Sequence, residues 1–313
     1  MGGISGAIGT ICAATANRAM ASDMMLDEAI KAKLRDPAYL DLHMAAVTAI
    51  RRVGKVDWYD SHFVRRFEAA KVYLAQVRPD ALEDFVRGFD ALLPPPGFAN
   101  VVIDDLFDAA TRDQIRDAAR AIPDEWLENE EMGDFGRHIV HDYPLFVELQ
   151  HRLLPRVSAL VGREVVAGYN FLSLYGGDGR CDPHMDEPKS MFTLDYCIEQ
   201  SEDWPIWFSR VVDWPTVETM RNWDSQAIKA DAALAFRPHV LRPGQALLFN
   251  GSSQWHYRDA IAPGGFCNLL FFHYYPAGCE DLIRPQMWPR HFAIAELGPL
   301  CELFHERGED GLI

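Results

Sequence analysis

Apolar residues recur at helical spacing from residue 23 to about residue 93. Positions three, four and seven residues apart share one face of a helix, so each repeat predicts an amphipathic helix. Asp80 is a candidate N-cap for the last of them. Three prolines in "LLPPPGF" at 92–98 cannot continue a helix and predict a boundary. The repeats are Leu26, Ile30 and Leu34; Leu40, Ala46, Val47 and Ile50; Phe63, Phe67 and Leu74; and Leu82, Phe85, Phe89 and Leu92.

The pattern changes after this boundary. "NVVID" predicts a short strand, and "AATRDQIRDAARAI" predicts an amphipathic helix with Thr111 as its N-cap. Residues 137–161 are predicted to be helical as well. A series of short apolar runs follows, separated by "GGDG", "RPGQ", "NGSS" and "APGG", and predicts strands joined by turns. The runs are "VVAGYNFLSLY", "MFTLDYCI", "WPIWFSRVV", "ALLFN" and "CNLLFFHYY".

Helices followed by many short strands favour an α+β protein with a mainly β core, a sandwich or barrel backed by helices. We expect three parts: an N-terminal helical region at 1–95, a β domain at 96–280 and a C-terminal helical segment at 281–313. The first 22 or so residues lack the basic start of a secretory signal, and we expect them to be disordered.

Composition narrows the functional classes. The 313-residue chain carries a formal charge of -16, which argues against nucleic acid as a partner because phosphate binding needs a basic surface. No run of about 18 apolar residues exists, so no membrane span is expected. The six cysteines form no Cys-x-x-Cys pair, and free thiols in the reducing cytoplasm are the simplest interpretation.

The stretch "RCDPHMDEP" at 180–188 contains the chain's single His-x-Asp. In an extended segment, residues i and i+2 project to the same side, so His184 and Asp186 would point together while Met185 points away. Two histidines and one carboxylate can hold a divalent metal and leave coordination positions open. One such triplet is also expected by chance in a chain of this composition.

A second histidine is required from a distant strand. His256 is the candidate, because "QALLFN", the turn "GSS" and Trp-His place it at the start of a strand. His138 and His141 fall in the predicted helix, and His239 falls in a loop. His273 lies within a strongly apolar strand, where a buried structural histidine is the simpler interpretation.

Residues 169–276 resemble the iron(II)/2-oxoglutarate-dependent oxygenases, most closely their prolyl-4-hydroxylase-like branch. The matching stretches are "LSLYGGDGRCDPHMDEP" and "VLRPGQALLFNGSSQWHYRDAIAPGGFCNLLFFHYYP". The resemblance implies a double-stranded β-helix (jelly-roll) fold, with Fe(II) held by His184, Asp186 and His256. It implies a dioxygenase that consumes 2-oxoglutarate, releases succinate and CO2, and hydroxylates or otherwise oxidises a C–H bond.

The cosubstrate anchor departs from the family pattern. The resemblance implies an Arg or Lys nine to eleven residues after the distal histidine, where this chain has Gly265, Phe266 and Cys267. Arg258 is the nearest substitute and would share a strand face with His256; a surface or salt-bridge arginine is the competing interpretation. Further candidates from the same resemblance are Tyr175, Tyr169 and Asn268, with Lys189, Arg180 and Arg242 as weaker ones.

Four functional hypotheses stay open at this point, of which the fourth is a helical interaction protein that carries an accessory barrel and whose residues 23–93 would fold and bind alone. The first is oxidation of a small-molecule or amino-acid-like substrate. The second keeps the chemistry but takes a protein or peptide side chain, with the helical region as a docking or homodimerisation element. The third is a non-catalytic metal-binding β-barrel, supported by the missing anchor cation.

Overall fold

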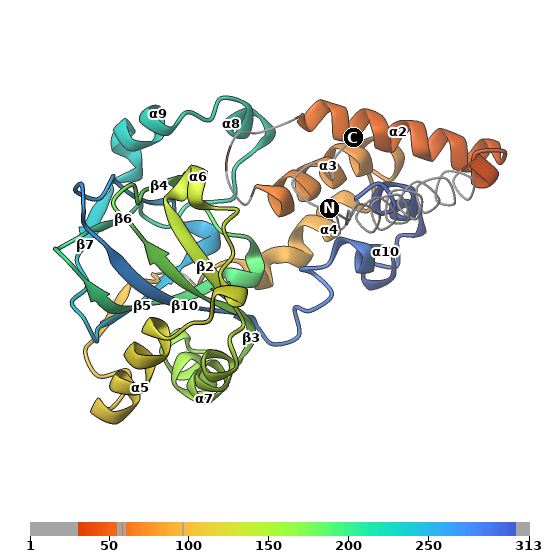
Figure 1. Ribbon diagram of the computed structural model, residues 1–313. Helices are drawn as coiled ribbons and strands as arrows, with labels where there is room; N and C mark the ends of the chain where they lie inside the picture. Colours follow the sequence, from red (N-terminus) through yellow and green to blue (C-terminus); the bar gives the residue numbers. More distant parts are fainter. Residues whose placement is uncertain (1–30, 55–57, 59–60, 96, 305–313) are drawn as a thin grey trace, which may run out of the picture.

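The computed structural model describes residues 31–54, 58, 61–95 and 97–304. The predicted helix repeat at Leu26 and Ile30 and the predicted disorder of the first 22 residues lie outside this range. The N-terminal and C-terminal helices gather at one end of the molecule, and two β-sheets with further helices form the other (Figure 1).

Two antiparallel sheets form the β part. The larger has the strand order β1-β8-β5-β10-β3-β2 and the smaller has the order β4-β9-β6-β7. The chain is thus a mixed fold of helices and antiparallel sheet. The strands are β1 (Val101–Ile103), β2 (Arg137–His141), β3 (Val165–Tyr175), β4 (Cys181–His184), β5 (Phe192–Gln200), β6 (Ile206–Phe208), β7 (Arg237–His239), β8 (Ala246–Asn250), β9 (His256–Arg258) and β10 (Cys267–Pro276).

Strand alternation explains why β10 is apolar almost throughout. Leu269 and Phe271 face a core shared with Ile206 and Phe208 of the smaller sheet. Side chains of the opposite parity, including Leu270 and Phe272, enter a second core on the outer face of the larger sheet. A strand buried on both faces has no polar alternation to show.

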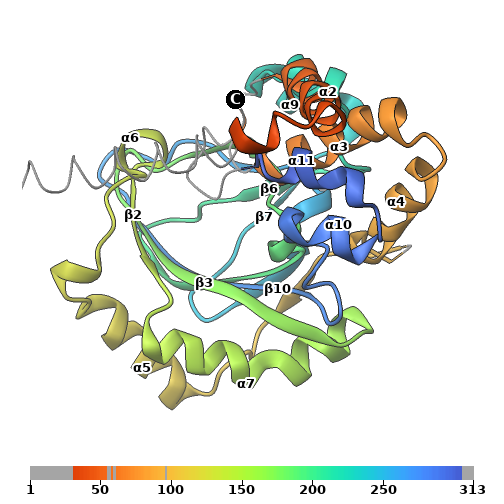
Figure 2. The ribbon, with the colours of Figure 1, turned by 90° about the vertical axis from the view of Figure 1, so that its right-hand side faces the viewer.

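Helices α5 (Ala109–Arg120) and α7 (Pro144–Val161) cover that outer face (Figure 2). The N-cap of α5 is Asp108, whose side chain accepts a hydrogen bond from the Thr111 amide, so the predicted Thr111 cap was wrong by one turn. Asp108 lies three residues before Thr111, and its carboxylate pairs with the Thr111 amide, which has no partner within the first turn of the helix.

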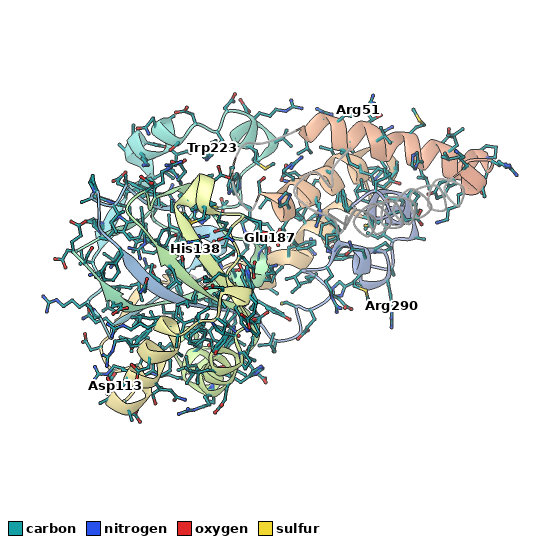
Figure 3. All side chains as sticks on the ribbon, in the orientation of Figure 1. Arg51, Asp113, His138, Glu187, Trp223 and Arg290 are labelled. Atoms are coloured by element: carbon teal, nitrogen blue, oxygen red, sulfur yellow. The ribbon has the colours of Figure 1, made fainter. Side chains whose placement is uncertain are left out.

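The prediction of a continuous helix over 137–161 was wrong at its start. Residues Arg137–His141 form β2, which pairs with β3, and the helix begins only at Pro144. His138 accordingly lies with the sheets, away from the helical end that carries Arg51 (Figure 3). The β-branched pair Ile139-Val140 favours the extended backbone.

A third core unites both ends of the described chain. Trp288 of the C-terminal segment is fully buried and its ring contacts Phe63, Phe85 and Phe89 of the N-terminal helices. We call the cluster of buried residues drawn from 45–92 and 279–304, together with Met185, Met220, Leu234 and Trp255, the helical core. Its helices are α2 (Pro37–Val53), α3 (His62–Val77), α4 (Leu82–Gly88), η1 (Phe89–Leu92), α10 (Trp288–His291) and α11 (Gly298–Cys301).

Short helices complete the described chain: η2 (Asp124–Trp126), α6 (Met132–Phe135), η3 (Pro188–Ser190), α8 (Val217–Arg221), α9 (Ser225–Ala230), η4 (Ala232–Leu234), η5 (Gly251–Ser253), η6 (Pro285–Met287) and η7 (Ala295–Leu297). Within the residues described, no helix combines the length and the apolar character needed to cross a membrane.

Candidate metal centre

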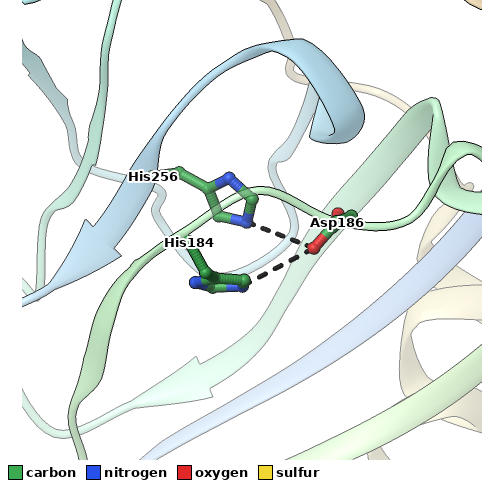
Figure 4. Close-up of side chains that lie close together, drawn as sticks. All are labelled: His184, Asp186 and His256. Carbon is green, nitrogen blue, oxygen red and sulfur yellow. Dashed lines mark ion pairs between the residues drawn. The ribbon is translucent and has the colours of Figure 1, made fainter. Parts of the chain in front are cut away.

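His184, Asp186 and His256 converge on one point (Figure 4). His184 ends β4, His256 begins β9, and the two are cross-strand partners with ring centroids 4.2 Å apart. The Oδ1 atom of Asp186 lies 3.5 Å from Nε2 of His184 and 3.4 Å from Nε2 of His256. All three side chains are buried, and one ligand atom from each lies within 4.8 Å of the others.

Backbone carbonyls orient both imidazoles. Nδ1 of His184 lies 2.9 Å from the Asp182 carbonyl oxygen, and Nδ1 of His256 lies 3.0 Å from that of Gln254. A carbonyl oxygen only accepts, so Nδ1 carries a proton in each ring, and Nε2, which faces Asp186, is the nitrogen whose lone pair a metal can take. This is the arrangement in which two histidines and a carboxylate bind a cation.

The Asp186 carboxylate is ionised, and the absence of a side chain at Gly251 leaves space for it. Burial opposes the charge of Asp186, but His256 and His184 hold the pKa of its carboxyl well below its usual range. A Cβ atom at Gly251 would collide with Oδ2 of Asp186 and with the Ser190 carbonyl oxygen. Glycine at 251 therefore leaves the space that the carboxylate fills. The donor set of two Nε2 atoms and one carboxylate fits a divalent transition metal.

The triad lines a narrow cavity of about 50 Å³ between the two sheets. Aromatic rings of β3 and β10, among them Tyr169, Phe171 and Phe271, form one wall. Phe171 stacks on Phe271 with ring centroids 4.8 Å apart. A cavity lined mostly by aromatic and apolar side chains, with a few polar groups among them, is typical of a small-molecule site.

Three of the four predicted cosubstrate residues line this cavity: Arg258, Tyr175 and Tyr169. Asn268 is not among the lining residues, and its amide donates to Glu199, where β10 begins and the neighbouring β5 ends. Arg258 is buried rather than exposed. Its guanidinium donates to Asp195 Oδ2 at 2.7 Å and to the Trp204 carbonyl oxygen at 2.6 Å.

A second arginine, Arg137, also lines the cavity, and the sequence did not predict it. Arg137 lies on β2, donates to the Tyr175 hydroxyl at 2.6 Å and pairs with Glu131. Its guanidinium also lies over the rings of Phe171 and Tyr175, each 5.3 Å from the centroid. The available signal was the β-branched run after Arg137, which the helical interpretation of 137–161 obscured.

Thr193 and His273 form a polar patch beside the triad. Thr193 Oγ1 lies 3.0 Å from Nδ1 of His273 and 3.3 Å from Oδ2 of Asp186. Burial lowers the pKa of His273 to about 3, so its ring is neutral. Nε2 of His273 has no hydrogen-bond partner among the described residues, although His273 lines the cavity. A polar group of a bound molecule would satisfy this atom.

Solved structures similar to this chain include proteins determined with iron, nickel or 2-oxoglutarate. HygX from Streptomyces hygroscopicus with nickel and 2-oxoglutarate bound is 14% identical, with a TM-score of 0.46, over 62% of this chain and 87% of HygX. EctD from S. alaskensis with bound Fe is 17% identical, with a TM-score of 0.43, over 64% of this chain and 76% of EctD.

An oxidoreductase of the 2OG-Fe(II) oxygenase family from Burkholderia pseudomallei is 12% identical, with a TM-score of 0.40, over 62% of this chain and 89% of that protein. No protein-family model and no curated protein sequence matches the chain. Identities of 12 to 17% leave the chemistry of this chain to be inferred from its own side chains.

Proposed function

We propose that the protein is an iron(II)- and 2-oxoglutarate-dependent dioxygenase that oxidises a C–H bond of a small molecule. The observation that carries the proposal is the convergence of His184, Asp186 and His256, with both Nε2 atoms directed at one carboxylate at the mouth of an enclosed cavity. The motif order that resembles the oxygenase family supports the same assignment.

We also assign the double-stranded β-helix fold. Its support is the way the chain visits the two sheets: β3, β5, β8 and β10 belong to the larger, and β4, β6, β7 and β9 to the smaller. This regular exchange between facing sheets places both ligand-bearing strands, β4 and β9, side by side in the smaller one.

In the proposed enzyme, His184, Asp186 and His256 hold the metal. Bound iron(II) and 2-oxoglutarate would supply oxidative decarboxylation coupled to C–H oxidation, with release of succinate and CO2. The Asp186 carboxylate would occupy a coordination position on the metal that a halide ion would otherwise need. This favours hydroxylation over halogenation. The aromatic wall excludes water from the cavity, which strengthens each polar contact made inside it.

Arg258 is the proposed anchor for the far carboxylate of 2-oxoglutarate. It projects into the cavity from the same strand as His256, and a guanidinium can bind a carboxylate with two parallel hydrogen bonds. Its existing bond to Asp195 means that an incoming carboxylate would share or replace that partner. We propose that Tyr175 and Tyr169 contact the same ligand. Asn268 does not line the cavity, so it could influence 2-oxoglutarate binding only indirectly.

A small-molecule substrate is favoured over a protein or peptide side chain because the cavity lies between the sheets. We place the enzyme in the cytoplasm, with support from five buried free cysteines among the described residues. Homodimerisation through the N-terminal helices stays a hypothesis. A non-catalytic metal-binding barrel would share the metal site but not the turnover.

Anaerobic titration with iron(II) and 2-oxoglutarate tests the proposal. The wild type is expected to give a visible charge-transfer band, and Asp186→Asn to weaken metal binding at least about 100-fold, because even outer partners of metal ligands contribute 10- to 100-fold. Asp182→Asn is the matched control, since Asp182 is exposed and two residues from His184.

Succinate release separates the remaining hypotheses. Turnover that depends on 2-oxoglutarate and disappears in Asp186→Asn supports the dioxygenase. Metal binding without any succinate, across a panel of small molecules and peptides, would leave the non-catalytic barrel instead.

A further inference from the structure

Two of the residues next to the metal ligands in the sequence pack into the helical core behind the cavity. Met185 stands between His184 and Asp186, and Trp255 directly precedes His256. Both Met185 and Trp255 are buried members of the helical core. The strand geometry that sends the ligands inward sends their neighbours outward. The helices therefore pack directly behind the metal centre.

One side chain of the helical core touches both ligand-bearing segments. Trp58, in the connection between α2 and α3, is 3% exposed. Its indole Nε1 donates to the Met185 carbonyl oxygen at 3.3 Å, and its ring lies 4.7 Å from that of Trp255, centroid to centroid. A single residue, far from both in sequence, thus contacts the backbone beside Asp186 and the side chain beside His256.

The peptide unit that joins Met185 to Asp186 is held from both sides. Trp58 binds its carbonyl oxygen, and the Asp186 amide donates to the Gly251 carbonyl oxygen at 2.9 Å. Met185 and Asp186 are both buried, so an unpaired carbonyl there would be unfavourable. Fixing this peptide plane fixes the direction in which the Asp186 side chain leaves the backbone.

We propose that Trp58 is a positioning residue of the metal centre, and that the helical region is part of the scaffold of this centre. The inference rests on the proposed function, since it assumes that the triad binds a metal. It assigns the N-terminal helices a role other than docking: they hold Asp186 and His256 in register from behind.

Comparison of two tryptophans tests the inference. Trp288 lies in the same core, is fully buried, and also donates its indole to a backbone carbonyl, that of Leu282 at 2.8 Å. Trp58→Phe and Trp288→Phe therefore each remove one indole–carbonyl bond from the helical core. Only the first removes it from the metal centre.

The readouts are cobalt(II) affinity, from the visible spectrum of the metal-loaded protein, and the Tm of the metal-free protein. We expect Trp58→Phe to weaken cobalt(II) binding about 10- to 100-fold, as for other residues that orient metal ligands. Trp288→Phe is expected to lower the Tm of the metal-free protein about as much as Trp58→Phe does. It should leave the cobalt(II) affinity within about twofold of wild type.

If Trp58→Phe does not fold, replacing the Trp58 indole with benzothiophene keeps the bicyclic shape and removes only the N–H donor. Wild-type affinity in the folded Trp58 variant, or an equal loss in Trp288→Phe, would overturn the inference while leaving the proposed function intact. Absence of cobalt(II) binding by the wild type would instead overturn the proposed function, and the inference with it.

Discussion

At the scale of single residues, Arg258 has two competing roles: it is the proposed anchor of 2-oxoglutarate and the partner of a buried carboxylate. It forms an ion pair with Asp195, whose side chain is 0% exposed, deep between the sheets. Burial raises the pKa of Asp195, and the neighbouring Arg258 opposes that rise. Removing one member of a buried pair leaves an uncompensated charge, which costs far more than the pair itself contributes. The proposed anchor is therefore also a structural residue.

The stability of metal-free variants tests the structural part. Arg258→Met should lower the free energy of unfolding by about 3 to 5 kcal/mol, because Asp195 stays buried without its partner. Adding Asp195→Leu should restore most of this loss. Urea unfolding measures all three proteins; a single variant as stable as wild type would mean that the pair is dispensable.

The anchor itself is tested by conservative changes that keep a positive charge. Arg258→Lys should raise the 2-oxoglutarate concentration required for half-maximal succinate release by one to two decades, since a lysine cannot form the bidentate contact. Arg137→Lys is the matched variant, because Arg137 lines the same cavity. The reverse order of effects would assign the anchor to Arg137.

His273 provides a pH prediction. Its pKa is about 3 in the folded protein and about 6.5 in an unfolded chain, so below pH 6.5 the unfolded state binds the extra proton. Stability is fully present above pH 6.5 and is lost as pH falls toward 3.

Between pH 7 and 5 this linkage amounts to about 2 kcal/mol. His273→Phe keeps a flat ring but cannot titrate, so its unfolding free energy should fall by about 2 kcal/mol less than that of wild type over this range. Denaturant unfolding at the two pH values gives the comparison, and parallel losses would show that folding does not lower the pKa of His273.

At the scale of elements, the features that could be predicted from the sequence are those set by short-range residue patterns. The triad was accessible because His184 and Asp186 share a two-residue spacing, and His256 begins a recognisable strand. β2 was missed because its five residues adjoin an 18-residue helix whose periodicity dominates any wider window. Arg137 was lost with it. The partner of Arg258, Asp195, lies 63 residues away and no local rule selects it.

The helical region illustrates the same limit. The boundary at "LLPPPGF" correctly ends the N-terminal helices, yet their core also draws on the C-terminal segment through Trp288, Leu297 and Leu300. The division of the chain into 1–95, 96–280 and 281–313 stays a prediction about domains. Spatial pairing of the two ends could not be read from either end alone.

A fragment of residues 23–93 tests whether the N-terminal helices are independent. Without the C-terminal segment, Phe63, Phe85 and Phe89 would lose the fully buried Trp288 as a packing partner. Helices of this length are marginal alone in water, so the fragment should show little helix by circular dichroism. Cooperative thermal unfolding of the fragment would instead favour an independent docking or dimerisation module.

At the scale of the whole molecule, the metal centre lies where two cores meet. Cys181, at the start of β4, belongs to the core between the sheets, whereas Met185 and Trp255 belong to the helical core. Cys181 and Met185 are only four residues apart in the chain. Order at the triad and order in both cores should therefore rise and fall together. The net charge of -16 adds no basic surface that would favour a nucleic-acid substrate.

Metal addition under anaerobic conditions tests this coupling. A ligand at 100 times its Kd stabilises the folded state by about 2.7 kcal/mol, which for a chain of this size corresponds to a Tm increase of roughly 4 °C. Trp58 and Trp255 lie against the centre, so tryptophan fluorescence reports on side-chain packing that includes this region, whereas far-UV circular dichroism reports on the helical backbone. Both should shift by the same amount with manganese(II), and neither should shift in Asp186→Asn. Two separate transitions, of which only one responds to the metal, would mean that the helices fold independently of the site they pack against.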